Sequence, residues 1–268
     1  MPLRADERLV IMGLAPTIEI ARALVMEGRV LNGTNKIMKP SEMVKKDANL
    51  VIKGETDPFV SRGAQKLKRA VEGFSLVLSD LVCMDVGAST GGFTDVMLRE
   101  GARRVYSIDV GYNLLDWRLR SNPRVTCMER TNARFIDADM FDEQPSFGAT
   151  DVSFISLKAV LPAIFSVLRE NALFVALIKP QFEAAKEDVG EKGVVRDKNV
   201  HINVVTDICR YVLSRGWTIE GLDFSPIRGP EGNIEFLLLL RNTTNAAQSF
   251  DFDTINDVIN HAYDKFIK

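Results

Sequence analysis

Histidine and cysteine are scarce in this chain of 268 residues. The two histidines, His201 and His261, are too few to build a histidine metal centre, and no metal site is expected. The three cysteines are widely spaced and odd in number, which excludes a disulfide framework and a Cys-x-x-Cys zinc site. This cysteine usage favours a reducing, cytoplasmic compartment.

Long apolar runs and an excess of charge of one sign are also missing. The longest apolar runs, 173–178 and 236–240, are much shorter than the roughly 20 residues of a membrane-spanning helix. The start, Met-Pro-Leu-Arg-Ala-Asp-Glu-Arg, has charges where a signal peptide needs an apolar stretch. A membrane partner is therefore not expected. The net charge of −2 gives no whole-chain basicity that would indicate nucleic acid.

Charge is nevertheless uneven along the chain. Residues 1–54 hold nine basic and six acidic residues, an excess of three positive charges. Thr17 is a predicted N-cap of one of two short helices, and Asn32-Gly33 indicates a tight turn. We interpret this segment as a small α+β module, either RNA-binding or a mere addition to the main domain. Residues 55–60 are polar and turn-prone, and they are predicted to be a linker.

Residues 61–245 alternate between strand-like and helix-like segments. Strands are expected at 81–85, 105–109, 125–128, near 150–151, and at 173–179, 217–224 and 236–240. Helices are expected at 157–168 and 202–213. This alternation predicts an α/β fold with a parallel sheet, helices on both faces and a ligand site beyond the carboxyl ends of the strands. The last segment, 246–268, is predicted to be a C-terminal extension with a weakly helical part.

The most distinctive motif, Asp-Val-Gly-Ala-Ser-Thr-Gly-Gly-Phe at 85–93, lies between a predicted strand and a predicted helix. Its glycines allow a ligand to approach the backbone closely, but it is neither Gly-x-Gly-x-x-Gly nor a phosphate loop. Asp85 would repel a pyrophosphate and would suit a cationic group, such as the amino group of S-adenosylmethionine. Asp109 ends the next strand, where a carboxylate accepts hydrogen bonds from ribose hydroxyls. The alternative is a glycine turn that serves packing only.

Four charged residues are predicted to meet at one edge of the sheet: Lys66, Asp151, Lys179 and Glu235. Lys179 ends a strand of apolar residues, and Glu235 stands at the start of another apolar run. A charge in such surroundings is costly unless it is paired. Each residue alone is more typical of a solvated strand end or a structural ion pair, whereas four at one edge favour a functional site.

Several longer motifs occur in a fixed order along the chain. They are Val-Ser-Arg-Gly-x-x-Lys-Leu, Asp-x-Gly-Ala-Ser-Thr-Gly-Gly-Phe-Thr, Asp-Val-Gly-Tyr, Glu-Arg-Thr-Asn-Ala-Arg, Asp-Val-Ser-Phe-Ile-Ser, Ile-Lys-Pro-Gln-Phe-Glu and Ser-Pro-Ile-Arg-Gly-Pro-Glu-Gly-Asn-Ile-Glu-Phe. Over residues 4–241 the chain closely resembles the TlyA-type, or hemolysin A, family. The resemblance implies an S-adenosylmethionine-dependent 2′-O-methyltransferase that acts on a cytidine ribose of ribosomal RNA in ribosomal subunits. It also implies an S4-like RNA-binding module followed by a Rossmann-like, FtsJ-like methyltransferase domain.

The resemblance assigns roles to individual residues. The four charged residues would be the catalytic tetrad. Our own hypothesis from the chemistry is that Lys179 orients the ribose hydroxyl and takes or steers its proton. The implied cofactor-binding residues are Ser61, Asp85, Gly87, Ala88, Ser89, Gly91, Gly92, Phe93, Asp109 and Asn132. The candidate RNA contacts, chosen for their charge, are Arg4, Arg8, Arg29, Lys36, Lys39 and Arg228, of which Arg228 is equally typical of an ordinary surface arginine. At 17–18 the chain has Thr-Ile where S4-like modules usually have Ser-Arg.

Two other functions stay open at this point. One is a non-catalytic RNA-binding protein with a vestigial methyltransferase fold, which the complete tetrad and glycine motif argue against. The other is a membrane-active hemolysin, as the family label suggests. The chain shows no cationic amphipathic helix of the lytic kind, which argues against that function.

Overall fold

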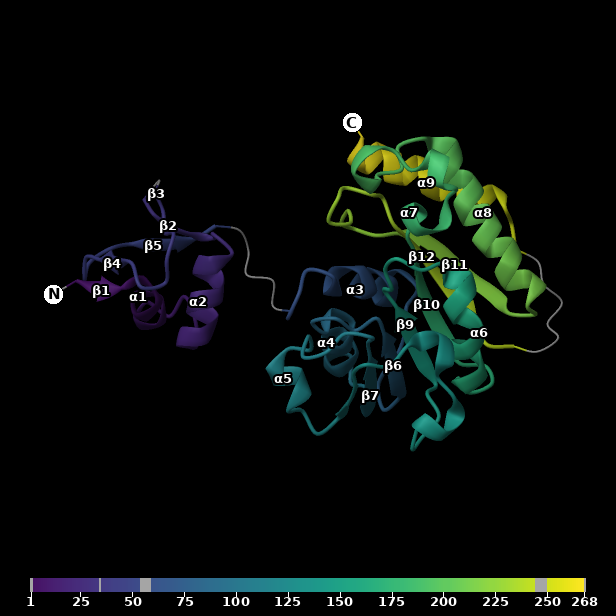
Figure 1. Cartoon of the computed structure of the whole chain (residues 1–268), viewed down its shortest axis with the longest axis horizontal. Coiled ribbons are helices and arrows are strands. Elements are labelled where there is room, and N and C mark those ends of the chain that lie inside the picture. Colours follow the sequence, from purple (N-terminus) through teal and green to yellow (C-terminus); the bar gives the residue numbers. More distant parts are fainter. Residues whose placement is uncertain (1, 34, 54–58, 244–249, 268) are drawn as a thin grey trace. The chain divides into compact units, whose positions relative to one another are not determined.

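The residues that the computed structural model describes are 2–33, 35–53, 59–243 and 250–267. They belong to two compact units, Met1–Pro58 and Phe59–Lys268, each with an apolar core of its own (Figure 1). Of the predicted linker, residues 55–58 lie outside the described ranges. Within those ranges, no helix combines the length and apolar character needed to cross a membrane.

The first unit is a small α+β module. Its elements are β1 (Leu3–Arg4), α1 (Ala5–Ile11), α2 (Ile18–Met26), β2 (Val30–Asn32), β3 (Asn35–Lys36), β4 (Met43–Val44) and β5 (Leu50–Ile52). Strand β1 pairs with β4, and β2 pairs with both β3 and β5. Thr17 is the N-cap of α2 as predicted, because its hydroxyl accepts a hydrogen bond from the Ile20 backbone N–H. Leu9, Leu24 and Val30 lie in its core.

A seven-stranded sheet forms the centre of the second unit, with the strand order β11-β12-β10-β9-β6-β7-β8. The strands are β6 (Val82–Val86), β7 (Arg104–Ile108), β8 (Val125–Met128), β9 (Phe147–Thr150), β10 (Leu173–Ile178), β11 (Thr218–Phe224) and β12 (Phe236–Arg241). Strand β12 is antiparallel to both of its neighbours, whereas the other pairs are parallel. The predicted parallel sheet is confirmed for the other strands, and β12 departs from it because residues 225–235 join β11 to β12 without the helical crossover that parallel pairing uses.

Helices cover both faces of this sheet. One face carries α3 (Ala64–Gly73), α4 (Gly92–Arg99) and α5 (Trp117–Arg120), and the other carries α6 (Leu157–Val167), α8 (Lys198–Ser214) and α9 (Asp253–Phe266). The shorter elements are α7 (Pro180–Glu183), η1 (Ala133–Phe135), η2 (Ala138–Met140), η3 (Lys186–Asp188) and η4 (Glu191–Gly193). Side chains alternate along β6, so that Met84 faces one helical layer and Cys83 faces the other.

The predicted helix near the C-terminus is α9, and it packs against α8 and β11 (Figure 1). Tyr263 on α9 donates a hydrogen bond to the Arg196 carbonyl over 3.0 Å. Its hydroxyl also lies 2.8 Å from Nδ1 of His201 on α8. The described part of the tail is therefore integrated into the second unit, and residues 246–249 of the predicted extension lie outside the described ranges.

The strand order places the sheet's topological switch between β6 and β9. From β6 the chain proceeds outward to β7 and β8, and it then returns to β9 on the other side of β6. In open sheets of this kind, ligands bind beyond the carboxyl ends of the strands at the switch. Gly87 and Asp151 follow directly after β6 and β9, so both lie at that position.

Candidate active site

The fold brings the four predicted tetrad residues to one edge of the sheet. Asp151 follows β9 and Lys179 follows β10, so parallel pairing places both at the carboxyl ends of these strands. Glu235 precedes β12, and the antiparallel direction of β12 brings its first residue to the same edge. Lys66 comes from the first turn of α3, on the buried face that also holds Leu67. Four separate elements therefore supply the cluster.

Both lysines of the cluster contact Asp151. Lys66 Nζ lies 3.0 Å from Asp151 Oδ2 and 2.8 Å from Glu235 Oε2. Lys179 Nζ lies 2.5 Å from Asp151 Oδ1 and donates a hydrogen bond to Ser153 Oγ over 2.9 Å. The Asp151 carboxylate thus bridges the Nζ atoms of the two lysines.

Burial makes these charges depend on one another. Lys66, Lys179 and Glu235 are at most 7% exposed. Burial alone would lower the pKa of Lys66, but the Asp151 and Glu235 carboxylates outweigh it and raise that pKa. Burial likewise opposes ionisation of Asp151, and the two lysines overcome it, so that the pKa of Asp151 is lowered. Burial raises the pKa of Glu235. Lys66 is therefore held as an ammonium beside an ionised Asp151.

The glycine motif forms the turn from β6 into α4. Gly87 has φ +83°, and a Cβ there would lie 2.9 Å from the Asp151 carbonyl oxygen. Only glycine permits this approach of the turn to the segment that carries Asp151. Gly91 has φ +96°, and a Cβ there would lie 2.3 Å from Leu119 Cδ1. Gly91 thus allows α5 to pack against the turn, so its glycine requirement is explained by packing.

Asp85 lies beneath this turn, and only one of its two carboxylate oxygens accepts hydrogen bonds. Oδ2 accepts hydrogen bonds from the Thr94 backbone N–H at 2.8 Å and the Thr94 hydroxyl at 2.7 Å. Among the described residues, Oδ1 is buried without a hydrogen-bond partner. Burial, opposed by the Thr94 hydrogen bonds, raises the pKa of Asp85 to about 7. A buried carboxylate oxygen of this kind fits a ligand with a cationic group.

Two adjoining cavities open at this edge. A cavity of about 470 Å³ has a largely apolar wall with Ile108, Asp109 and Asn132. A second, of about 310 Å³, is lined by Ser61, Lys66, Asp85, Lys179 and turn residues that include Ala88, Gly92 and Phe93. Gly87, Ser89, Asp151 and Ser153 line both. Three of the four tetrad residues, Lys66, Asp151 and Lys179, therefore line the second cavity, and Glu235 is buried behind Lys66.

The predicted ribose ligand, Asp109, is oriented by backbone hydrogen bonds. Its Oδ2 accepts from the Ser89 N–H and its Oδ1 from the Gly111 N–H, both over 2.7 Å. A carboxylate has about four acceptor positions, so these bonds orient the group and leave capacity for ligand hydroxyls. Asn132 lines the same cavity, and its Oδ1 accepts from the Arg134 backbone N–H over 3.1 Å.

The predicted RNA contacts are not part of these cavities. Five of them, Arg4, Arg8, Arg29, Lys36 and Lys39, belong to the first unit. There, Arg4 pairs with the buried Asp6, and Arg8 donates to the Ala48 carbonyl. In the second unit, Arg228 lies over the Phe266 ring of α9 and lines a separate cavity with His201.

Three residues at the site escaped the sequence analysis. Ser153 accepts a hydrogen bond from Lys179, and its place two residues after Asp151 was the available signal. Thr94 is fully buried and orients Asp85. Phe154 is 90% exposed with φ +62°, and it lines the larger cavity beside the tetrad. An exposed aromatic side chain cannot be recognised from an apolar pattern.

The residues of the site fit S-adenosylmethionine. The unpartnered oxygen of Asp85 suits an ammonium group, the larger cavity offers an apolar wall with Asp109 for a nucleoside, and the glycine turn lies between them. The acidic residue before the glycines, Asp85, distinguishes the site from one that binds a pyrophosphate. The fold and the site define a nucleoside-binding α/β methyltransferase.

Comparison with known proteins agrees with this class. The FtsJ-like methyltransferase family matches residues 59–242. The chain is 40% identical over 247 residues to the 16S/23S rRNA (cytidine-2′-O)-methyltransferase TlyA of Mycobacterium tuberculosis, with 92% of each covered. It is 36% identical to Hemolysin A of Brachyspira hyodysenteriae, with 88% of this chain and 98% of the relative covered. A solved structure described as a hemolysin from Streptococcus thermophilus is 42% identical, with a TM-score of 0.79 over 99% of this chain and 97% of that one.

The chain belongs to the FtsJ-like methyltransferase family. It is a methyltransferase whose cofactor is S-adenosylmethionine, as the resemblance implied.

Proposed function

We propose that this enzyme methylates the 2′-hydroxyl of a cytidine ribose in ribosomal RNA, and that its substrate is the RNA within a ribosomal subunit in the cytoplasm. The observation that carries the proposal is the pair of buried lysines bridged by Asp151 in a cavity that adjoins a nucleoside-sized one. The relative from M. tuberculosis is named for methylation of cytidine 2′-oxygens in 16S and 23S rRNA, which supports this choice of acceptor.

A ribose hydroxyl is a weak acid, so the enzyme must position it and remove its proton. S-adenosylmethionine supplies the electrophilic methyl group. Lys179 Nζ orients the hydroxyl oxygen and receives its proton, while Ser153 and Asp151 hold Nζ in place. Lys66 remains an ammonium between Asp151 and Glu235.

The same geometry supports the proposed cofactor-binding residues. Asp85 and Ser61 hold the methionine end in the smaller cavity, beside Ala88, Ser89, Gly92 and Phe93. Asp109 and Asn132 hold the nucleoside end in the larger one. Gly87 permits the close approach of the turn, and Gly91 seats α5 behind it.

The first unit is proposed to be an S4-like RNA-binding module at 1–54, joined by a linker at 55–60 to a methyltransferase domain at 61–245. Its excess of basic residues supports this role. Arg4, Arg8, Arg29, Lys36 and Lys39 are its proposed phosphate contacts, and Arg228 is a further one on the second unit. The internal pairing of Arg4 with Asp6 gives that arginine a structural role as well.

The proposal is tested with methyl-labelled S-adenosylmethionine and ribosomal subunits purified from cells that lack the enzyme. Labelled RNA that resists alkaline cleavage at one cytidine is the expected result, because a methylated 2′-oxygen cannot attack the adjacent phosphodiester. Label on a base rather than a ribose contradicts the assigned acceptor. Absence of label from both subunits, with cofactor binding intact, contradicts the assigned substrate.

A further inference from the structure

A basic pocket lies on the α4–α5 side of the second unit, apart from the two cavities of the active site. It has a volume of about 320 Å³, and its polar wall consists of Asp95, Arg99, Arg118, Asn122 and Arg124. We call it the α5 pocket. None of the sequence predictions includes these residues.

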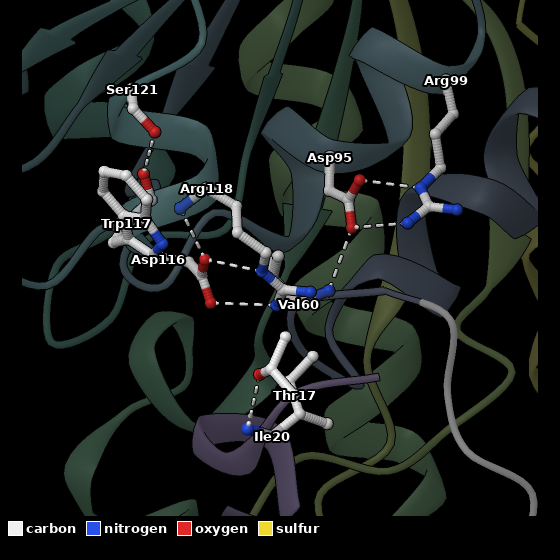
Figure 2. Close-up of polar contacts among 9 residues, drawn as sticks. All are labelled: Thr17, Ile20, Val60, Asp95, Arg99, Asp116, Trp117, Arg118 and Ser121. Carbon is white, nitrogen blue, oxygen red and sulfur yellow. Dashed lines mark hydrogen bonds and ion pairs between the residues drawn. The ribbon is translucent and has the colours of Figure 1, made fainter. Parts of the chain in front are cut away.

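The arginines of the α5 pocket are held in place and remain accessible. Arg118 makes a two-pronged contact with Asp116, through Nε at 2.9 Å and Nη2 at 3.0 Å, and its side chain is 52% exposed. These bonds use two of the five N–H donors of the guanidinium. Figure 2 shows Arg118 and Arg99 on either side of Asp95, with Asp95 accepting hydrogen bonds from Arg99 and from the Val60 backbone N–H.

The charge balance of the α5 pocket is positive. Asp95 and Asp116 pair with Arg99 and Arg118 respectively. Arg124 Nη1 donates to the carbonyls of Leu98 and Ala102, and no carboxylate of the described residues forms an ion pair with it. One positive charge is thus left over in a recess formed by planar guanidinium groups, a combination that binds phosphate well.

An exposed tryptophan accompanies this pocket. Trp117 is the first residue of α5 and is 74% exposed. Figure 2 shows its ring on the opposite side of α5 from the Arg118 side chain. Surfaces that bind single-stranded nucleic acid typically combine exposed aromatic rings, on which bases stack, with arginines that pair with phosphates.

Helix α5 also borders the cofactor site. The Asp116 backbone N–H donates to the Thr90 carbonyl over 3.2 Å, and Leu119 packs against Gly91 of the same turn. A substrate strand whose ribose reaches the tetrad can therefore continue across α5.

We propose that the α5 pocket binds a backbone phosphate of a single-stranded stretch of the RNA substrate and that Trp117 stacks on an unpaired base of that stretch. The inference rests on the proposed RNA substrate and extends it to a second contact region outside the active site.

The phosphate contact is tested with Arg118→Gln, using Arg103→Gln as the matched control. Arg103 also makes a two-pronged contact with a carboxylate, Glu143, and its side chain is 49% exposed, but it precedes β7 at the amino edge of the sheet. Binding of the full-length protein to unmodified ribosomal subunits is measured between 50 and 200 mM salt, a range of about fourfold. Arg118→Gln is expected to weaken binding and to reduce the slope of log K against log salt by about 0.7. Arg103→Gln is expected to leave both unchanged.

The stacking contact is tested by fluorescence, since the chain has two tryptophans and Trp217 is only 7% exposed. Subunit binding is expected to protect Trp117 from acrylamide quenching, and Trp117→Phe is expected to abolish that change. Trp117→Ala is expected to weaken binding about 5- to 150-fold, and Trp117→Phe to restore most of the loss.

Cofactor affinity, measured in parallel, is expected to stay unchanged in Arg118→Gln and Trp117→Ala. The α5 pocket is not an RNA site if both variants methylate subunits and bind them with the wild-type affinity and salt slope. The proposed function is left intact by that result. That result would assign the pocket to another partner, such as an acidic protein. If the wild type transfers no methyl group but binds RNA with the expected dependence on Arg118, the proposed function fails and the pocket stands.

Discussion

At the scale of single residues, the site depends on how one carboxylate divides its oxygens between two lysines. Asp151 gives Oδ2 to Lys66 and Oδ1 to Lys179. Lys66 has a second carboxylate partner in Glu235, whereas Lys179 has the Ser153 hydroxyl. Lys179 lines the smaller cavity and donates to Ser153 on the wall that both cavities share, so we assign it to the ribose hydroxyl.

Replacing Lys179 by Ala is expected to reduce methyl transfer by roughly 10²- to 10⁴-fold, the usual contribution of a positioned proton acceptor. Lys179→Arg is expected to be as defective, because a guanidinium does not release its proton. Cofactor affinity from calorimetry is expected to change little in both variants. Lys68→Ala, which removes an exposed lysine of the same helix as Lys66, is the control and keeps full activity. An equal loss of cofactor affinity and transfer would reassign Lys179 to cofactor binding.

Asp85 predicts a pH dependence of cofactor binding. Its pKa is raised to about 7, and the ammonium group of the cofactor pairs with the ionised form. Below pH 7 the carboxyl must lose a proton on binding, so affinity is expected to fall toward tenfold per pH unit and to level off above pH 7. Calorimetry in buffers of different ionisation enthalpy counts the released proton.

Two controls isolate this effect. Asp85→Asn is expected to bind the cofactor more weakly and without the pH dependence. 5′-Methylthioadenosine, which lacks the ammonium group, is expected to bind the wild type with an affinity that does not vary between pH 6 and 8. The same pH dependence for both ligands would show that Asp85 does not contact the ammonium.

At the scale of elements, the positions of the strands were easier to predict than the direction of β12. The sequence predicted β6, β7, β8 and β10 within one or two residues, and for β9 it predicted the end alone. Most residues of these strands are buried, except in β8, which is half-buried. The reversal of β12 depends on the absence of a crossover helix in residues 225–235, which only the folded path reveals. The same reversal brings Glu235 to the site. The sequence motif identified Glu235, and the antiparallel direction of β12 explains its position.

The other features that the sequence did not reveal are contacts between distant segments. The resemblance implies that Gly91 binds the cofactor, which stays a prediction, and the structure adds a packing role through its left-handed backbone and the approach of Leu119. The α5 pocket combines residues of α4, α5 and the turn before β8, which form no motif together. Glycine spacing and charged strand ends are local signals in the sequence. Contacts between distant segments depend on the tertiary structure.

The turn between β6 and α4 offers a prediction with a matched control. Gly87 and Gly216 have nearly the same φ, +83° and +85°, but a Cβ at Gly216 meets nothing within 4 Å. Gly216→Ala is expected to cost about 1 kcal/mol of unfolding free energy from backbone strain alone. Gly87→Ala adds the clash with the Asp151 carbonyl and is expected to cost more and to weaken cofactor binding. Urea titration and calorimetry measure the two effects, and equal costs in the two variants would contradict the close approach.

At the scale of the whole molecule, the two units have separate cores, and every residue that lines the two active-site cavities belongs to the second. We therefore expect two unfolding transitions in differential scanning calorimetry, the smaller unit melting first because a domain of its size buries less of its surface. Cofactor at about 100 times its Kd stabilises its own unit by about 2.7 kcal/mol. The second transition is expected to rise by several degrees while the first stays in place, and Asp85→Asn is expected to lose most of the rise. A single transition that shifts as a whole with cofactor would show that the two units unfold as one.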